Sequence, residues 1–258
     1  MAAKAKVAET AAPTDHVLVD PSEGRAPDFD HFTCANEYGF YCVPREFAGR
    51  DVPKLLRVGQ VYEPKTLAFL RRMAKDGDIV SGGAFVGDFF PALSEVLTDG
   101  AELHSFEPNP ISYQAALSTI GLNELTNVVM SQVAVGEKPA TLPLQVVRGG
   151  KTAMAARAKI VHDPEKAGTI DVPVVTLDSL IPKSRSVSVL HLDIEGHEMQ
   201  AILGAKALIK RCKPVIVLEA SKPHRRKFYA QALGQLFGAA NYQLSGIIEH
   251  NAIYMAHG

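Results

Sequence analysis

Cysteine is scarce in this sequence: its 258 residues include three, Cys34, Cys42 and Cys212. An odd number of cysteines without paired spacing fits neither a disulfide framework nor a zinc site, so we expect a reducing compartment. The first residues, MAAKAKVAETAAPTD, contain no continuous apolar stretch and do not resemble a secretory signal. Together these observations predict a cytoplasmic location.

An excess of either charge is also missing, since 27 Lys and Arg residues stand against 28 Asp and Glu residues. The resulting net charge of −1 gives no overall attraction to nucleic acid or to an anionic membrane. No apolar run approaches the ~20 residues that a bilayer span needs. We therefore expect neither nucleic acid nor a membrane as a partner, and we leave a homo-oligomer open.

Despite these absences, 47% of the residues are hydrophobic, which is enough to build a sizeable core. Residues 1–30 are rich in Ala, Pro and Asp without periodicity, which predicts a flexible tail. Residues 31–76 are interpreted as an aromatic lead-in, or lid, that includes a helix. Residues 77–258 are interpreted as the main domain, with a polar insertion at about 137–171 between two strands.

The lead-in carries one clear periodic pattern. Leu67, Leu70 and Met73 fall at helical spacing beside basic residues, which predicts an amphipathic helix that ends at Asp76-Gly77. Four aromatic residues before this helix are predicted to pack against the sheet edge rather than to cover a substrate: Phe32, Tyr38, Phe40 and Tyr41.

Short apolar runs alternate with helical patterns through the main domain. The runs typical of strands are 79–80, 102–106, 128–133, 187–192 and 215–218. Helical spacing occurs over 89–97, 112–120 and 198–209, and the last two apolar runs, 242–248 and 252–255, predict a hairpin at the sheet edge. Because parallel strands need crossover helices, this rhythm predicts an α/β fold with a parallel sheet covered on both faces.

A glycine-rich turn follows the first predicted strand, in the segment DIVSGGAFVGD over residues 78–88. Glycines at such a turn let the backbone approach a ligand closely. Gly82, Ala84 and Gly87, with Glu107 twenty residues later, approximate a dinucleotide fingerprint and would suit an NAD-dependent oxidoreductase. Gly83 and Gly87 suit the smaller S-adenosylmethionine instead, and the loop alone leaves both interpretations open.

Glu107 ends the second strand of the main domain, in the segment HSFEPNP. A carboxylate at the carboxyl end of a parallel strand can accept hydrogen bonds from both hydroxyls of a ribose. Pro108 ends the strand, and Asn109 is then placed to cap the following helix or to reach the ligand.

Acids and a histidine follow the strand over 187–192. Asp193, Glu195, His197 and Glu198 lie within six residues, and this grouping at a buried edge is costly unless a ligand, water or metal compensates it. The simpler interpretation is that Glu195 and Glu198 favour the start of a helix.

Three residues of this region are candidate bases: Asp193, His197 and Glu219. His197 has the most suitable unperturbed pKa. Asp193 and Glu219 could instead hold a divalent metal ion, which we do not favour. His191, inside the strand, is predicted to be a packing residue, and the basic run Lys222–Lys227 is predicted to be a solvated loop.

Taken together, these motifs resemble the FkbM-type family of S-adenosylmethionine-dependent methyltransferases. The segments that carry the resemblance are VYEP (61–64), GDIVSGGAFVGDF (77–89), FEPNP (106–110), SQVAVGE (131–137), VPVVTLDSLIP (172–182), LHLDIEGHEMQAILGA (190–205) and PVIVLEA (214–220). The D-x-E-G-x-E stretch and the upstream T-L-D-S-L are its most specific parts.

The resemblance implies a class I methyltransferase fold, Rossmann-like, with a seven-stranded, mostly parallel sheet, an antiparallel last strand and helices on both faces. It also implies methyl transfer to a hydroxyl of a small molecule, such as a carbohydrate or a polyketide. The cofactor-binding residues that it implies are Glu63, Gly83, Ala84, Phe85, Gly87, Glu107, Asn109, Gln132, Val133 and Asp193.

Within that set, the resemblance places Gly83, Ala84, Phe85 and Gly87 around the methionine and ribose, and Glu107 on the ribose. It places Asn109, Gln132 and Val133 around the adenine, and Asp193 near the methionine portion or the reacting centre.

One position departs from the family. The first strand of the family usually ends in an acid two residues before the first loop glycine, whereas this sequence has Ser81 there. The departure motivates another hypothesis, a binding module that keeps the fold and the cofactor but has lost turnover. Glu63 is then the candidate that reaches the amino group of the cofactor.

Overall fold

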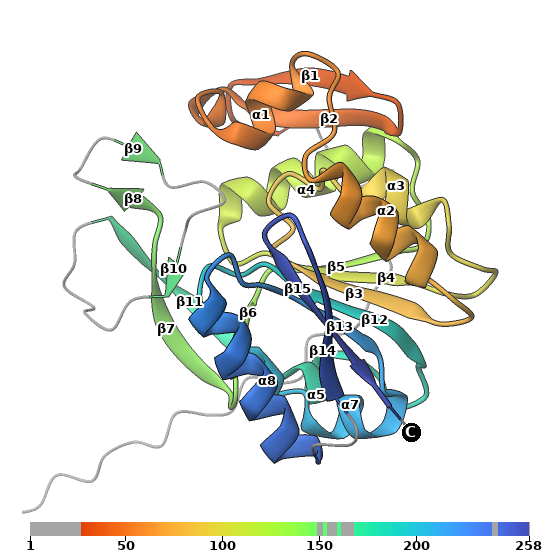
Figure 1. Cartoon of the computed structure of the whole chain (residues 1–258). Coiled ribbons are helices and arrows are strands. Elements are labelled where there is room, and N and C mark those ends of the chain that lie inside the picture. Colours follow the sequence, from red (N-terminus) through yellow and green to blue (C-terminus); the bar gives the residue numbers. More distant parts are fainter. Residues whose placement is uncertain (1–26, 149–151, 154–158, 161–167, 239–241, 258) are drawn as a thin grey trace, which may run out of the picture.

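The computed structural model describes residues 27–148, 152–153, 159–160, 168–238 and 242–257 (Figure 1). Its central sheet has seven strands in the order β14-β15-β13-β12-β3-β4-β5. The parallel strands are β3 (Asp78–Gly82), β4 (Leu103–Phe106), β5 (Val128–Ser131), β12 (Val187–Leu192) and β13 (Val215–Glu219). The last strand, β15 (Asn251–Ala256), runs antiparallel between β13 and the edge strand β14 (Tyr242–Ile248).

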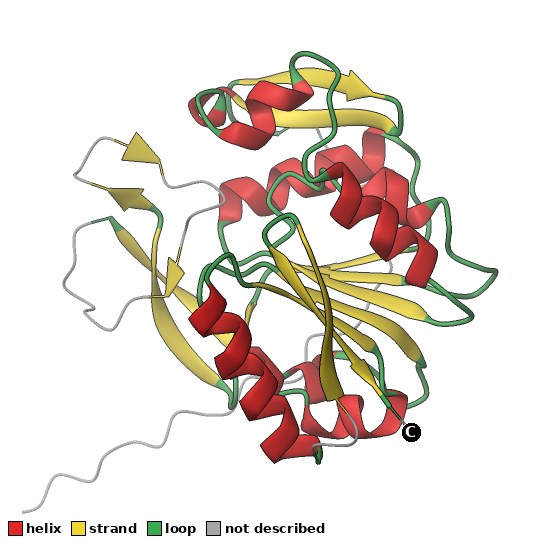
Figure 2. Cartoon of the chain, viewed as in Figure 1, coloured by secondary structure: helices red, strands yellow, loops and turns green. Residues whose placement is uncertain are grey.

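Alternating side chains of these strands pack into two hydrophobic cores, one on each face of the sheet. Ile79 and Val189 pack with helices α2 (Pro64–Met73), α3 (Phe90–Ser94) and α4 (Pro110–Leu122). Val80 and Leu190 pack with helices α5 (Leu177–Leu180), α6 (Glu198–Leu203), α7 (Lys206–Cys212) and α8 (Pro223–Phe237). Figure 2 shows helices on both sides of the sheet, which confirms the predicted α/β architecture.

Several predicted boundaries are wrong. The helix predicted over 198–209 is interrupted after Leu203 and resumes at Lys206. Gly204, in the interruption, packs closely on the backbone: a Cβ there would lie 2.0 Å from the carbonyl oxygen of Gly136. Helix α2 ends at Met73, before the predicted Asp76. The basic run over 222–227 is the start of helix α8 rather than a loop.

The lead-in contains a hairpin that the sequence pattern did not predict. Strands β1 (His31–Asn36) and β2 (Gly39–Pro44) pair antiparallel and are followed by η2 (Arg45–Phe47) and helix α1 (Asp51–Leu56). Tyr41 is buried in a cluster with Phe85 and Ala115 of α4, and the backbone N–H of Cys42 donates to the hydroxyl of Thr119 at 3.1 Å. The hairpin thus lies on α4 (Figure 1), and the predicted packing of its aromatic residues on the sheet edge is wrong.

A second, smaller sheet lies beside the central one (Figure 1) and has the strand order β10-β7-β11-β6. Its strands are β6 (Ala134–Val135), β7 (Ala140–Gln145), β10 (Lys159–Ile160) and β11 (Thr169–Val175). Strands β8 (Val147–Arg148) and β9 (Thr152–Ala153) form a separate pair. Strands β7 and β11 pair antiparallel, and β7 lies within the segment at about 137–171 that was predicted as an insertion. Most of the residues between these two strands lie outside the described part of the chain.

Within the described part of the chain, no helix combines the length and the apolar character that crossing a membrane requires.

Candidate functional site

The main cavity of the described residues lies at the carboxyl ends of β3, β4 and β12, where open α/β sheets bind ligands. Its volume is about 200 Å³. Its walls come from the glycine-rich loop, from the ends of these three strands and from two parts of the lead-in, Gly49–Val52 and Tyr62-Glu63. The lead-in is therefore part of the candidate site.

Three residues of the glycine-rich loop have positive φ: Gly83 at 85°, Phe85 at 47° and Gly87 at 74°. A Cβ on Gly83 would lie 1.9 Å from the carbonyl oxygen of Asp193, so only glycine allows the loop to pack on the end of β12. Gly83, Ala84 and Phe85 line the cavity, whereas Gly87 does not, and their predicted contacts with the cofactor stay predictions.

Glu107 lies in the cavity wall with both carboxylate oxygens fixed by backbone groups. Oε2 accepts from the N–H of Phe85 at 3.0 Å, and Oε1 accepts from the N–H of Asn109 at 2.9 Å. Burial raises the pKa of Glu107 to about 7. These contacts hold the carboxylate beside the glycine-rich loop, with lone pairs left to accept from a ligand.

The three residues predicted around the adenine lie in different places. Asn109 caps helix α4, accepting from the N–H of Ile111 at 3.2 Å, and lines a second cavity of about 170 Å³. That cavity is mostly apolar: besides Asn109 and Glu46, its walls contain Phe47, Pro110, Ile111, Val146 and Ile170. Gln132 is exposed, and Val133 is buried in the hydrophobic core that contains helices α5 to α8. Neither residue lines these two cavities.

Carboxylates gather around the main cavity. Glu63, Asp88, Asp193 and Glu195 line it together with Glu107. Burial raises the pKa of Asp88 to about 7. Burial, followed by the nearby charges of Glu219, Glu63, Glu195 and Glu198, raises the pKa of Asp193 well above its usual range. A ligand that carries positive charge would relieve this repulsion.

Two of the predicted bases lie outside the walls of this cavity. Glu219 ends β13, the strand next to β12, but does not line the cavity. His197 is directed toward Gly136, where a Cβ would lie 3.5 Å from its Nε2. The geometry therefore favours Asp193, while the catalytic roles of His197 and Glu219 stay predictions.

Glu198 stabilises the loop that follows Asp193 and does not line the main cavity. Its carboxylate is fully buried, and Oε1 accepts from the N–H of Gly196 at 3.0 Å. Oε2 accepts from the hydroxyl of Tyr229 at 2.9 Å and from the guanidinium of Arg225 at 2.8 Å. Glu198 thus fixes the loop that follows Asp193, a more specific role than favouring the start of a helix.

One histidine of this cavity, His191, was predicted to be only a packing residue. His191 lines the cavity, and its Nδ1 lies 3.0 Å from the hydroxyl oxygen of Ser81 on the neighbouring strand β3. The ring stacks on Phe89 with 5.9 Å between centroids, and burial lowers its pKa to about 4. Its position two residues before Asp193 is the signal that placed it on the same face of the strand.

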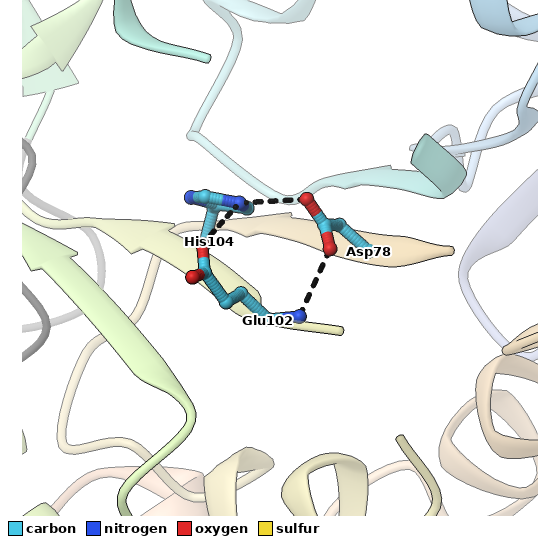
Figure 3. Close-up of side chains that lie close together, drawn as sticks. All are labelled: Asp78, Glu102 and His104. Carbon is cyan, nitrogen blue, oxygen red and sulfur yellow. Dashed lines mark hydrogen bonds and ion pairs between the residues drawn. The ribbon is translucent and has the colours of Figure 1, made fainter. Parts of the chain in front are cut away.

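A metal site at Asp193 and Glu219 finds no support. In the described residues, the one grouping with a suitable arrangement of donors is Asp78, Glu102 and His104, at the opposite edge of the sheet (Figure 3). Asp78 accepts from His104 Nε2 at 3.0 Å and from the Nε of Arg185 at 2.7 Å. Although burial alone would raise the pKa of Asp78, these hydrogen bonds lower it to about 2. The carboxylate is thus already paired with the guanidinium of Arg185.

Comparisons with known proteins agree with this geometry. Residues 81–244 match the family model described as the methyltransferase FkbM domain. The crystal structure of methyltransferase FkbM from Methylobacillus flagellatus KT is similar, with 18% identity and a TM-score of 0.50. That match covers 70% of this chain and 43% of the other, so the chain spans less than half the length of that protein.

Two further structures are less similar. A SAM-dependent methyltransferase from Aquifex aeolicus is 12% identical over 81% of this chain and 99% of its own, with a TM-score of 0.42. The tRNA (uracil-54, C5)-methyltransferase from Pyrococcus abyssi, in complex with S-adenosyl-L-homocysteine, is 13% identical over 88% of this chain and 43% of its own, with a TM-score of 0.46. No curated protein matches the chain.

Proposed function

Because this chain belongs to the FkbM methyltransferase family, we propose that it transfers a methyl group from S-adenosylmethionine to a hydroxyl group of a small molecule. The chain has the class I methyltransferase fold, with its antiparallel last strand between the two strands that precede it. A sugar, a polyketide or a related molecule is the acceptor class that we propose.

The observation that carries this proposal is the set of carboxylates around the main cavity. S-adenosylmethionine has a positively charged sulfur and a positively charged amino group, which Asp193, Glu63 and Asp88 are suited to attract. Glu107 is suited to accept from the ribose hydroxyls, and Gly83 lets the backbone come close to the ligand. The residues present therefore fit the cofactor.

The second cavity fits the remaining part of the cofactor. Glu107 lines the main cavity, and Asn109 to Ile111 line the second one. The chain turns between them, so a ligand held at Glu107 has an apolar recess close by for a flat ring. We propose that the adenine occupies this recess.

The cofactor supplies an electrophilic methyl group when it is bound, and the protein has to align the acceptor and remove its proton. Asp193 is suited to take that proton, since its carboxylate lines the cavity and its raised pKa makes it a stronger base than an exposed aspartate. The lead-in residues Tyr62 and Glu63 close the same cavity, which supports the interpretation of residues 31–76 as a cover over the domain at 77–258.

Two alternatives make different predictions. A nicotinamide oxidoreductase would bind NAD, whereas the family match and the antiparallel last strand favour the methyltransferase. A binding module without turnover, suggested by Ser81, would bind S-adenosylmethionine but release no S-adenosylhomocysteine.

Calorimetry with S-adenosylmethionine, S-adenosylhomocysteine and NAD tests the cofactor. We expect saturable binding of the first two and none of NAD, and the reverse result would overturn the proposal. Release of S-adenosylhomocysteine with a panel of glycosides, hydroxylated polyketides and RNA then tests the acceptor. Turnover with RNA alone would overturn the small-molecule assignment, and binding without turnover on any acceptor would favour the binding module.

A further inference from the structure

His191, a residue of the main cavity wall, has one ring nitrogen without a hydrogen-bond partner. The side chain is 5% exposed, and its Nδ1 is engaged by Ser81 at 3.0 Å. Its Nε2 has no partner, and among the residues that line the cavity in the described part of the chain it is the one buried polar side-chain atom in that condition. Since buried polar groups are rarely left unpaired, this atom indicates a ligand group at that point.

The charges of the cavity decide which ligand group this is. On the proposed function, on which this inference rests, the bound cofactor brings a sulfonium, an ammonium and a carboxylate. Asp193, Glu63 and Asp88 attract the first two and repel the third. The carboxylate therefore needs a hydrogen-bond donor that is not itself an acid.

We propose that His191, oriented by Ser81, binds the carboxylate at the amino-acid end of S-adenosylmethionine through its Nε2–H. Arg50 also lines the cavity, but it takes part in another interaction within the chain. Nδ1 lies 3.0 Å from the hydroxyl oxygen of Ser81. In the proposed arrangement the hydroxyl donates to Nδ1, and the hydrogen of the neutral ring is on Nε2.

The same arrangement accounts for the departure from the family at position 81. A carboxylate there would add a further negative charge on the same face of the sheet as Asp193, beside the carboxylate of the ligand. A serine hydroxyl instead orients the ring of His191 without charge. The burial that lowers the pKa of His191 to about 4 keeps the ring neutral at physiological pH, so it acts as a donor and not as a counter-ion.

Two near-isosteric variants separate the nitrogens of the ring. His191→Gln keeps an N–H donor near the position of Nε2, whereas His191→Asn keeps one only near the position of Nδ1. Calorimetry compares S-adenosylmethionine with decarboxylated S-adenosylmethionine, which lacks only the carboxylate. We expect His191→Asn to weaken S-adenosylmethionine by about tenfold, the effect of one hydrogen bond to a charged group, and His191→Gln to restore most of that loss.

The decarboxylated compound identifies the ligand group, because its affinity should be the same for all three proteins. Equal weakening of both compounds by His191→Asn would assign His191 a merely structural role and overturn the inference. Unchanged affinity of both would also overturn it. If the wild-type protein binds neither compound, the proposed function itself fails, which distinguishes that failure from the failure of this inference.

Discussion

Buried acids at the two edges of the central sheet have pKa values shifted in opposite directions. At the amino edge, Asp78 is 3% exposed and receives hydrogen bonds from His104 and Arg185, and its pKa is lowered to about 2 (Figure 3). At the carboxyl edge, Asp193 and Glu107 lie among other acids, and burial raises the pKa of each.

This difference separates stability from function. Charges at the amino edge are compensated within the chain, as in structural ion pairs. At the carboxyl edge, Asp193 is buried among like charges, which costs stability but prepares the cavity for a cationic ligand. A cationic ligand would then balance the negative charges at the carboxyl edge.

The largest effect is expected from Arg185→Met at the amino edge. This change leaves Asp78 buried without its guanidinium and should lower the free energy of unfolding by about 3 kcal/mol. Urea unfolding measures it, and the affinity for S-adenosylmethionine serves as the control and should not change. A loss below about 1 kcal/mol would contradict a stabilising role for this edge.

At the carboxyl edge we expect Asp193→Asn to act on turnover instead of stability. Release of S-adenosylhomocysteine with an acceptor found in the panel should fall by at least roughly a hundredfold, about 2.7 kcal/mol, because the proposed base is lost. The free energy of unfolding should stay equal or rise, since a repelled buried acid is removed. If Asp193→Asn lowered the free energy of unfolding without lowering turnover, the carboxyl edge would have a structural role, which would contradict the comparison.

The pH dependence of stability should also distinguish the two edges. The pKa of Asp88 is about 7 in the folded chain and about 3.8 when unfolded, so the folded state favours the protonated form. Stability should therefore fall by about 1 kcal/mol or more as pH rises from about 4 to 7. Asp78, with its lowered pKa, acts in the opposite sense and loses its contribution as pH falls from about 3.8 toward 2. Thermal unfolding from about pH 2 to 7 measures the contributions of Asp88 and Asp78. A rise in stability between about pH 4 and 7 would contradict the prediction for Asp88.

The smallest effect is expected from Ser81→Ala, which leaves the ring of His191 in place but without its orienting hydrogen bond. Affinity for S-adenosylmethionine should fall by a factor of about three to five, close to 1 kcal/mol. Decarboxylated S-adenosylmethionine is the control, and an equal loss for that compound would argue against orientation by Ser81.

Much of this site could be predicted because its signals are local. The strand ending at Glu107 and the glycine-rich turn over 82–87 are each fixed by a few consecutive residues. His191 could not be assigned, because its partner Ser81 lies 110 residues away and the contact depends on how β3 and β12 align. A lone histidine in a strand gives no signal of such a partner.

The hairpin of the lead-in was missed for a different reason. Its two-residue turn is Glu37-Tyr38, which lacks the Asn-Gly or Asp-Gly signature of tight hairpins. The fold is set by contacts with α4, such as that between Cys42 and Thr119, which no local pattern shows.

The most direct test of the central claim is calorimetry of S-adenosylmethionine with Glu107→Ala, compared with Glu102→Gln at the opposite edge. Loss of the proposed ribose contact at Glu107 should weaken binding by about tenfold or more, corresponding to roughly 1.5–3 kcal/mol. Glu102→Gln should leave affinity unchanged. Equal affinity for Glu107→Ala and the wild-type protein, in a folded variant, would contradict the claim that the carboxyl-edge cavity is the cofactor site.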